Sequence, residues 1–441
     1  MKKPLSAPRS VPPALASRAF AFELLQAVVR QNQAFDEALE KHAGLAKLEK
    51  RDRAFVHVLV ATVLRRLGQI DEAIKACLDK PQELKAAAHD LLRLGAAQLL
   101  FLATPPHAAV DTLVELAAAD NATAPYKGLI NAVLRRLGRE GQELLKHQDD
   151  AKLNTPGWLW LNWRQAYGVA KARAIANANL GEALTDVSVK GDATAWAAPL
   201  SARLLPTGSL RLDGATPITA LPGFAEGAWW VQDAAAALPV KLLGDVRGHK
   251  VIDLCAAPGG KTAQLAALGA EVIAVDRSEK RLLRLKENLA RLQLSAEVVC
   301  RDALSYAPPA KVPFVLLDAP CTATGTIRRH PDVQRLKTPE DMARMVELQR
   351  KLLDHVATAL LAPGGTLVYA VCSLQPEEAE LQIESLLQRH PALCRVPIQP
   401  TEVGGEEAFV SPAGDLRCLP SLWPDLGGID GFFAARLKSV G

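Results

Sequence analysis

Apolar residues recur three and four positions apart between residues 18 and 148, which is the spacing of one face of a helix. Gly128 stands near the predicted start of one helix, and Gly138 and Gly141 predict its end. We therefore predict a multi-helix domain over residues 1–148, in which each helix packs one apolar stripe. The stripes are Phe20, Leu24 and Val28; Phe55, Val58, Leu59 and Val63; Leu91, Leu94 and Leu99; Val110, Leu113 and Leu116; and Leu129, Val133 and Leu134.

The pattern changes from residue 236 onwards into short apolar runs that alternate with helical segments. Such alternation predicts an α/β, Rossmann-like domain over residues 236–441, with a mostly parallel, doubly wound sheet. Ligands of these sheets bind at the carboxyl ends of the strands. The predicted strands are Val251–Leu254, Glu271–Val275, Ala296–Cys300, Phe314–Leu317 and Thr366–Ala370, and predicted helices include Ser278–Leu292 and Glu340–Leu361.

The region between these two domains, residues 149–235, fits neither pattern. It opens with the tryptophan-rich stretch "NTPGWLWLNWRQAYG", and the short strand-like pieces "DVSVK" and "GSLRL" follow between Pro and Gly turns. We predict a small α+β connector. Trp158, Trp160 and Trp163 are interpreted as packing anchors, with the border of an RNA surface as the alternative.

Composition narrows the class of protein. Hydrophobic residues make up 49% of the 441 residues, which supports a large core, and the net charge of +4 permits an anionic partner without requiring one. The seven cysteines show no zinc-site spacing, and their odd number argues against a disulfide framework, so we expect no metal and a cytoplasmic location. No secretory signal and no membrane span are expected either.

The stretch "VIDLCAAPGGKT" ends like a phosphate-binding P-loop. Cys255 stands where that motif needs its first glycine, and Pro258 removes a backbone N–H from the phosphate cradle. Both departures argue against a triphosphate site, and no G-x-G-x-x-G motif indicates a dinucleotide.

Acidic residues follow the ends of the next three predicted strands: Asp276 in "VIAVD", Asp302 in "VVCRDAL" and Asp318 in "VLLDAPC". Asp276 is placed to bind two ribose hydroxyls and Asp302 to meet an adenine amino group. Each acid alone could be a helix cap. Three in strand order behind a glycine turn favour a nucleoside without polyphosphate, and S-adenosyl-L-methionine fits.

Two cysteines also follow strand ends. Cys321 lies in "DAPCTATG" and Cys372 in "LVYAVCSL", and both are expected to face the cofactor crevice. Thiols are needed when the methyl acceptor is C5 of cytosine, because a thiolate added at C6 makes C5 nucleophilic. The other thiols are interpreted as small buried hydrophobes: Cys77, Cys255, Cys300, Cys394 and Cys418.

Four stretches, "DLCAAPGGKT", "VDRS", "DAPCTATGTIRRHPD" and "YAVCSLQPEE", together resemble the Nol1/Nop2/Sun family of RNA cytosine-C5 methyltransferases. "LPGFAEGAWWVQDAAAAL" is similar to this family's entry to the catalytic domain. "RDRAFVHVLVATVLRRLGQID" and "YKGLINAVLRRLG" resemble the NusB-type RNA-binding domain. The pairing of the two domains resembles the bacterial 16S rRNA methyltransferases of this family. The resemblance implies a target of the cytosine-967 type.

The resemblance implies roles for individual residues. Cys372 would be the nucleophile, and Cys321 would assist release of the product. Val371 stands where the family commonly has Thr, and Thr322 where Ser is commoner. Asp276 would bind the ribose, Asp302 the adenine region, and Asp318 the surroundings of the methionine and the target base. The methionine and ribose side of the cofactor would be wrapped by Cys255, Ala256, Ala257, Pro258, Gly259, Gly260 and Lys261.

Basic residues leave some assignments open. Arg328 and Arg329 of "IRRHPD" suit RNA phosphate contacts, whereas His330 is read as a structural or RNA-contact residue rather than a general base. Lys261 is either a helix-start residue or part of the site. The "LRR" pairs at 64–66 and 134–136 are read as solvated helix faces, with phosphate contact as the alternative.

The leading hypothesis is therefore an S-adenosyl-L-methionine-dependent methyltransferase that acts on 16S rRNA, expected to be a monomer. The alternatives are a non-catalytic RNA-binding or ribosome assembly factor, a methyltransferase of another RNA, and a small-molecule methyltransferase. The three acids and the two cysteines argue against the assembly factor, and the helical domain argues against a small substrate.

Overall fold

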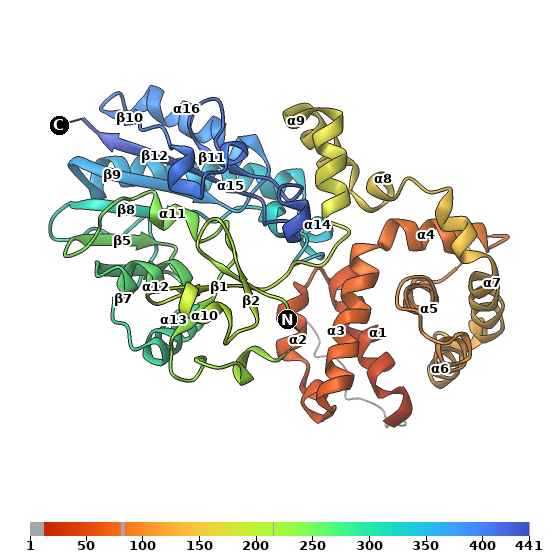
Figure 1. The fold of residues 1–441 in the computed structure, drawn as a ribbon. Helices are drawn as coiled ribbons and strands as arrows, with labels where there is room; N and C mark the ends of the chain where they lie inside the picture. Colours follow the sequence, from red (N-terminus) through yellow and green to blue (C-terminus); the bar gives the residue numbers. More distant parts are fainter. Residues whose placement is uncertain (1–12, 81–83, 215, 441) are drawn as a thin grey trace. The chain divides into compact units, whose positions relative to one another are not determined.

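The computed structural model describes residues 13–80, 84–214 and 216–440 (Figure 1). It divides into two compact units. The first contains the chain up to Leu161 together with His330–Lys337, and the second contains Asn162–Arg329 and Thr338 onwards. The domain boundaries at 148 and 235 remain predictions.

The first unit is helical, as predicted. Its helices bury a common apolar core, to which α1, α3, α5, α6 and α7 contribute. In α7 the stripe Ile130, Val133, Leu134 and Leu137 is fully buried while the residues between them are largely exposed, which is the expected amphipathic pattern. The helices are α1 (Pro13–Gln31), α2 (Phe35–Lys41), α3 (Lys50–Arg65), α4 (Leu67–Ala76), α5 (Ala86–Leu100), α6 (Pro106–Ala119), α7 (Lys127–Lys146) and α8 (Asp150–Asn154).

The prediction that Gly138 and Gly141 end a helix is wrong, because α7 continues to Lys146. Gly141 instead gives room to a neighbouring helix: a Cβ atom there would lie 2.3 Å from Cδ2 of Leu100 in α5. Packing between helices therefore explains this glycine, whereas Gly128 does lie at the helix start as predicted.

A segment from late in the chain completes the helical unit. Residues 330–337 include α14 (Val333–Leu336), and a carboxylate oxygen of Asp332 accepts a hydrogen bond of 2.9 Å from the backbone N–H of Phe35 at the start of α2. Arg335 donates to the backbone oxygen of Asn154 at 2.7 Å, and Leu336 packs against the helical core. The periodicity of apolar residues did not predict that residues 330–337 belong to the helical unit.

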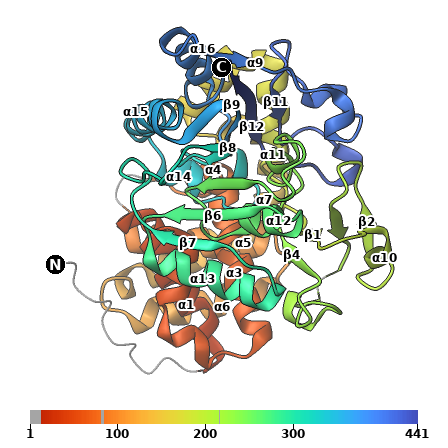
Figure 2. The same cartoon turned by 90° about the vertical axis from the view of Figure 1, so that its left-hand side faces the viewer.

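The second unit contains the predicted mostly parallel sheet. Its strand order is β10-β12-β9-β8-β5-β6-β7, and β11 pairs with β12. Neighbouring strands are parallel throughout the part β9-β8-β5-β6-β7, whereas β12 runs antiparallel to β9. Figure 2 shows the succession β9, β8, β6, β7. The strands are β5 (Lys250–Leu254), β6 (Glu271–Asp276), β7 (Glu297–Cys300), β8 (Val312–Asp318), β9 (Leu361–Val371), β10 (Leu393–Arg395), β11 (Leu416–Cys418) and β12 (Phe432–Ser439).

Helices cover both faces of this sheet, as a doubly wound fold requires. Alternate residues of β5, β8 and β9 face α15 and α16 in one apolar cluster, and the residues between them face α11 in another. Figure 1 shows α15 and α16 on one side of the sheet and α12 and α13 on the other. These helices are α11 (Leu238–Lys241), α12 (Gly260–Ala267), α13 (Glu279–Leu292), α15 (Pro339–His355) and α16 (Glu380–Arg389).

The predicted helix Glu340–Leu361 ends earlier than expected. A capping box between Thr338 and Asp341 begins α15 at Pro339, the α-helix stops at His355, and a π-helical turn over Val356–Leu360 leads directly into β9. Leu361 therefore belongs to the strand.

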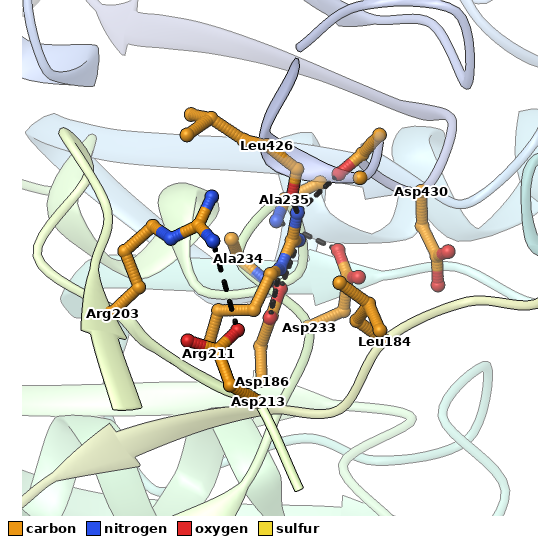
Figure 3. Close-up of polar contacts among 12 residues, drawn as sticks. Leu184, Asp186, Arg203, Arg211, Asp213, Asp233, Ala234, Ala235, Leu426 and Asp430 are labelled. Atoms are coloured by element: carbon orange, nitrogen blue, oxygen red, sulfur yellow. Dashed lines mark hydrogen bonds and ion pairs between the residues drawn. The ribbon is translucent and has the colours of Figure 1, made fainter. Parts of the chain in front are cut away.

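A smaller antiparallel sheet, of order β2-β3-β1-β4, belongs to the same unit. Its core includes Val187, Leu210 and Trp229, and it contains the two predicted strand pieces. The Arg211 guanidinium of β3 pairs with Asp186 of β1 at 2.7 Å, and neither side chain is more than 2% exposed (Figure 3). The elements are β1 (Asp186–Val189), α10 (Thr194–Ala197), β2 (Ala202–Leu204), β3 (Leu210–Leu212) and β4 (Trp229–Val231).

The tryptophan-rich stretch forms the start of α9 (Gly157–Ala178). Trp160 and Trp163 are buried, in agreement with packing anchors. Two cysteine predictions are wrong: Cys300 and Cys394 are exposed, because each lies in a strand at an outer edge of the large sheet. Cys77 and Cys418 are buried as expected, and Cys255 is half-buried.

The two "LRR" pairs differ. Arg135 and Arg136 lie on an exposed helix face, where Arg136 pairs with Glu140 at 2.8 Å. Arg65, in contrast, is buried, so that the solvated-face interpretation is wrong for this residue. Within the described residues, no helix has both the length and the apolar character needed to cross a membrane.

Candidate functional site

The loop after β5 is held in an unusual backbone conformation. Cys255 has a φ of 62°, and Gly259, at the N-cap of α12, has a φ of 102°. A Cβ atom on Gly259 would lie 2.7 Å from Cγ of Leu285 in α13, so both the backbone angle and the helix packing require glycine. Gly260 then begins α12, as the strand–turn–helix prediction expected.

Beneath this loop lies a buried carboxylate that sequence reasoning missed. Asp253 in β5 is fully buried and accepts a hydrogen bond of 2.6 Å from the hydroxyl of Thr262. Burial raises the pKa of Asp253 to about 7. The signal was present in the sequence as one acid within the apolar run "VIDL", which is costly unless the acid has a partner or a function.

The predicted cofactor acids Asp276 and Asp302 line one cavity together with Cys255. Apolar side chains complete its wall: Ala303, Pro320, Leu348 and Leu352; Arg277 and Arg281 also line it. Leu348 and Leu352 come from α15 and were not identified from sequence, because nothing in a helical apolar stripe separates a cavity wall from a core position.

The Asp276 carboxylate is fixed by the backbone. It accepts hydrogen bonds from the N–H groups of Ala257, at 3.1 Å, and Ser278, at 2.9 Å, and Arg281 lies 3.6 Å away. Asp302 accepts from the N–H of Leu304 at 2.9 Å. Pro258, Gly259 and Gly260 line a separate hollow with Phe224 and Trp230, so that the loop residues predicted to wrap the cofactor do not all face one space.

Lys261 is part of a buried ion pair. Its amine lies 2.7 Å from a carboxylate oxygen of Asp318, and its side chain is 11% exposed. Burial alone would lower the pKa of Lys261, but the Asp318 carboxylate outweighs this and raises it. The amine also lies 5.1 Å from the centre of the Phe432 ring. Lys261 is thus more than a helix-start residue, and its part in a cofactor site stays a prediction.

The two thiols predicted to face the cofactor crevice lie next to each other, and neither is among the residues that line the cavity of Asp276 and Asp302. The Sγ atoms of Cys321 and Cys372 are 3.5 Å apart, on loops after the adjacent strands β8 and β9. The loops are tied together by hydrogen bonds from Gly325 N to Cys372 O, at 3.0 Å, and from Ala319 N to Ala370 O, at 2.9 Å.

The surroundings of the thiols differ in charge. The hydrogen bond with Cys372, burial and the nearby Glu378 carboxylate raise the pKa of Cys321 well above its ordinary value. Among the charges that act on Lys261, a thiolate at Cys372 is one that raises the lysine's pKa. Lys261 is thus close enough to Cys372 for their charges to interact, and the raised pKa of Cys321 favours a protonated thiol there.

The basic residues after this loop make contacts within the protein. Arg328 is buried and donates to the backbone oxygen of Gly427. Arg329 pairs with Asp233 at 2.9 Å and with Asp430 at 3.1 Å. In the helical unit, His330 lies 3.2 Å from Asp36. These partners give all three residues a structural role, and contact with RNA by any of them stays a prediction.

A doubly wound sheet with a cavity lined by Asp276 and Asp302 at its strand ends, and with an amine and two thiols after neighbouring strands, defines the class: a Rossmann-like methyltransferase domain. Residues 240–438 match the model of the family "16S rRNA methyltransferase RsmB/F", and residues 15–139 match that of the NusB family. The chain belongs to the RsmB/F family of 16S rRNA methyltransferases.

Individual relatives support this family assignment. The chain is 38% identical to the ribosomal RNA small subunit methyltransferase B of Vibrio cholerae serotype O1, over 89% of this chain and 95% of the relative. It is also 38% identical to the Salmonella arizonae protein of that name, over 85% and 90%. Among solved structures, PH0851 matches with a TM-score of 0.73 and 25% identity over 98% of this chain and 100% of the other.

Proposed function

We propose that the chain transfers a methyl group from S-adenosyl-L-methionine to C5 of one cytosine in 16S rRNA, through a covalent bond between Cys372 and C6 of that base. The observation that carries this proposal is the 3.5 Å separation of two thiols beside the Lys261–Asp318 pair. Methylation of an amine, hydroxyl or carboxylate would not need a thiol pair, because those acceptors are already nucleophilic.

The cavity beside the thiols fits the cofactor. Pro320, Leu348 and Leu352 offer apolar surfaces against which an adenine ring can pack, and the Asp302 carboxylate lies at the same wall. Asp276 has its carboxylate pre-oriented by two backbone N–H groups, which suits a pair of ribose hydroxyls. When bound here, S-adenosyl-L-methionine supplies an electrophilic methyl group.

Cys372 acts first on the base. Its thiolate adds to C6 of the cytosine, the S–C6 bond forms, and the electron pair of the C5–C6 double bond becomes available at C5 to take the methyl group. A base then takes the C5 proton, the electron pair of the C5–H bond re-forms the C5–C6 double bond, and the S–C6 bond breaks to release the thiolate. Lys261 stabilises the thiolate before addition and again after elimination.

Cys321 is suited to the second half of this sequence. As a protonated thiol in contact with Sγ of Cys372, it is placed to assist release of the adduct. The assignment follows from the surroundings of Cys321, because its hydrogen bond with Cys372, its burial and the Glu378 carboxylate all raise its pKa.

The proposed chemistry sets two conditions, one on the RNA target and one on the cellular compartment. C6 is inaccessible while the base is stacked, and exposing it costs roughly a few kcal/mol, so we infer an unpaired cytosine as target, of the cytosine-967 type. Free reacting thiols also require a reducing compartment, and we infer the cytosol. Bisulfite mapping of 16S rRNA from a strain that lacks the protein, against its parent, identifies the nucleotide.

Replacement of the nucleophile tests the proposal. Cys372→Ala should bind S-adenosyl-L-methionine with the parent's affinity in a filter-binding assay and transfer no labelled methyl group to unmodified 16S rRNA. Cys394→Ala, which removes an exposed thiol from β10, is the matched control and should keep full turnover. Turnover in Cys372→Ala would refute the mechanism, and failure of the parent to bind the cofactor would favour a non-catalytic RNA-binding protein.

A further inference from the structure

A buried carboxylate lies directly behind the two thiols. Glu378, in the short 3₁₀ turn Pro376–Glu378 after β9, has no exposed surface. A fully buried glutamate is costly unless each of its oxygens is hydrogen-bonded. The groups that satisfy this one identify what it holds in place.

Its hydrogen bonds reach both thiol loops. The backbone N–H of Thr322 donates to Oε1 of Glu378 at 2.9 Å, and the Thr322 hydroxyl donates to Oε2. The Ser373 hydroxyl donates to the same Oε2 at 2.6 Å. Thr322 directly follows Cys321, and Ser373 directly follows Cys372, so one carboxylate joins the residues next to both sulfurs.

A third element supports this carboxylate. Nε2 of Gln349, in α15, donates to Oε1 of Glu378 at 3.1 Å and to the backbone oxygen of Pro320 at 2.8 Å. Pro320 directly precedes Cys321. Four hydrogen-bond contacts thus meet the two carboxylate oxygens of Glu378, which satisfies both of them.

We propose that Glu378 is the positioning residue of the thiol pair: its carboxylate ties the loop of Cys321 to the loop of Cys372 and places a carboxylate charge close to Cys321. This inference rests on the proposed cysteine chemistry. Glu378 touches neither thiol through a hydrogen bond, and it acts through Thr322, Ser373 and its charge.

The sequence difference at position 322 fits this role. Threonine replaces the commoner serine there, and its hydroxyl is the group that meets Glu378. Only a hydroxyl at 322 is needed, so either residue serves.

Alkylation of Cys321 tests the charge directly and needs no turnover. In a Cys372→Ser background, the rate of Cys321 modification by iodoacetamide is followed by mass spectrometry against pH, with and without Glu378→Gln. We expect loss of the charge to move the midpoint to lower pH and to speed modification near pH 8 about tenfold. Glu377→Gln, the same change at a neighbouring half-buried glutamate, should leave the midpoint unchanged.

A purely structural carboxylate would give a different result. Loosening of the loops would speed alkylation by one factor at every pH, and an unmoved midpoint in Glu378→Gln would overturn the proposal. Glu378→Asp, which keeps the charge but shortens the reach, should retain the parent's midpoint while lowering kcat at least tenfold with little change in KM.

A variant that keeps the charge covers the case in which Glu378→Gln does not fold. Ser373→Ala removes the hydroxyl that meets Oε2 of Glu378, together with its hydrogen bonds with Gln375, and keeps the Glu378 side chain. We expect kcat to fall while the alkylation midpoint stays constant, and an unchanged kcat would overturn the tie between the loops. Failure of the proposed function is separate, because it appears as turnover in Cys372→Ala whatever the midpoint does.

Discussion

The sulfur atoms of Cys321 and Cys372 lie 3.5 Å apart although 51 residues separate them in the chain. The sheet explains this contact: β8 and β9 are parallel neighbours, and Asp318 is the register partner of Ala370. Each thiol comes two or three residues beyond these partners, so the register of two strands brings both to the same edge. The proximity of the two thiols is thus a consequence of strand pairing, and Glu378 accepts hydrogen bonds from both loops beyond the strands.

Asp276→Asn should weaken cofactor binding by about tenfold or more, because an amide replaces the charged acceptor that we assign to the ribose hydroxyls. The amide keeps the size of the side chain, and its oxygen can still accept from one of the N–H groups of Ala257 and Ser278. Isothermal titration with S-adenosyl-L-methionine measures the effect. Glu271→Asn, at the exposed start of the same strand, is the control, and equal affinities for Asp276→Asn and the parent would exclude the ribose assignment.

The raised pKa of Asp430 predicts that the stability of the second unit depends on pH. Burial and the neighbouring Asp233 carboxylate raise the pKa of Asp430 to about 6, in spite of its partner Arg329. Because the folded protein holds this proton more tightly than the unfolded chain, the stability that the group contributes is complete below about pH 4 and is lost as the pH rises through about 6. Figure 3 shows Asp430 near Asp233 and the Arg211–Asp186 pair.

Asp430→Asn removes this titration. Relative to the parent, the variant's free energy of unfolding should rise by up to ~3 kcal/mol between about pH 4 and pH 7, as measured by urea denaturation at each pH. Asp425→Asn, at an exposed position nearby, should show no such trend. A constant difference between Asp430→Asn and the parent across this range would mean that Asp430 is ionised in both states.

The sequence was informative where position along a strand decides the outcome. The acids Asp276, Asp302 and Asp318 and both thiols follow strands that apolar runs predict well, and the parallel topology brings those ends together. The glycine turn was also recognisable, because a φ of 102° at Gly259 is a conformation that few other residues adopt.

The sequence was uninformative where a side chain's partner lies far away in the chain. Arg329 resembles a phosphate ligand until Asp233 and Asp430 are found beside it. Glu378 is one of several acids in "QPEEAE", and only its burial against Thr322 and Ser373 distinguishes it from the others. The burial of Cys300 and Cys394 was predicted wrongly, because the periodicity of apolar residues does not show which strands lie at the edges of the sheet.

The most direct test of the account is the capture of the covalent intermediate. Cys321→Ala should retain addition of Cys372 to the base and lose assisted release, so that a protein–RNA complex accumulates on a denaturing gel after incubation with unmodified 16S rRNA and S-adenosyl-L-methionine. Cys321→Ala combined with Cys372→Ala should give no such complex. Absence of the complex in Cys321→Ala with turnover intact, or its persistence in the double variant, would contradict the account.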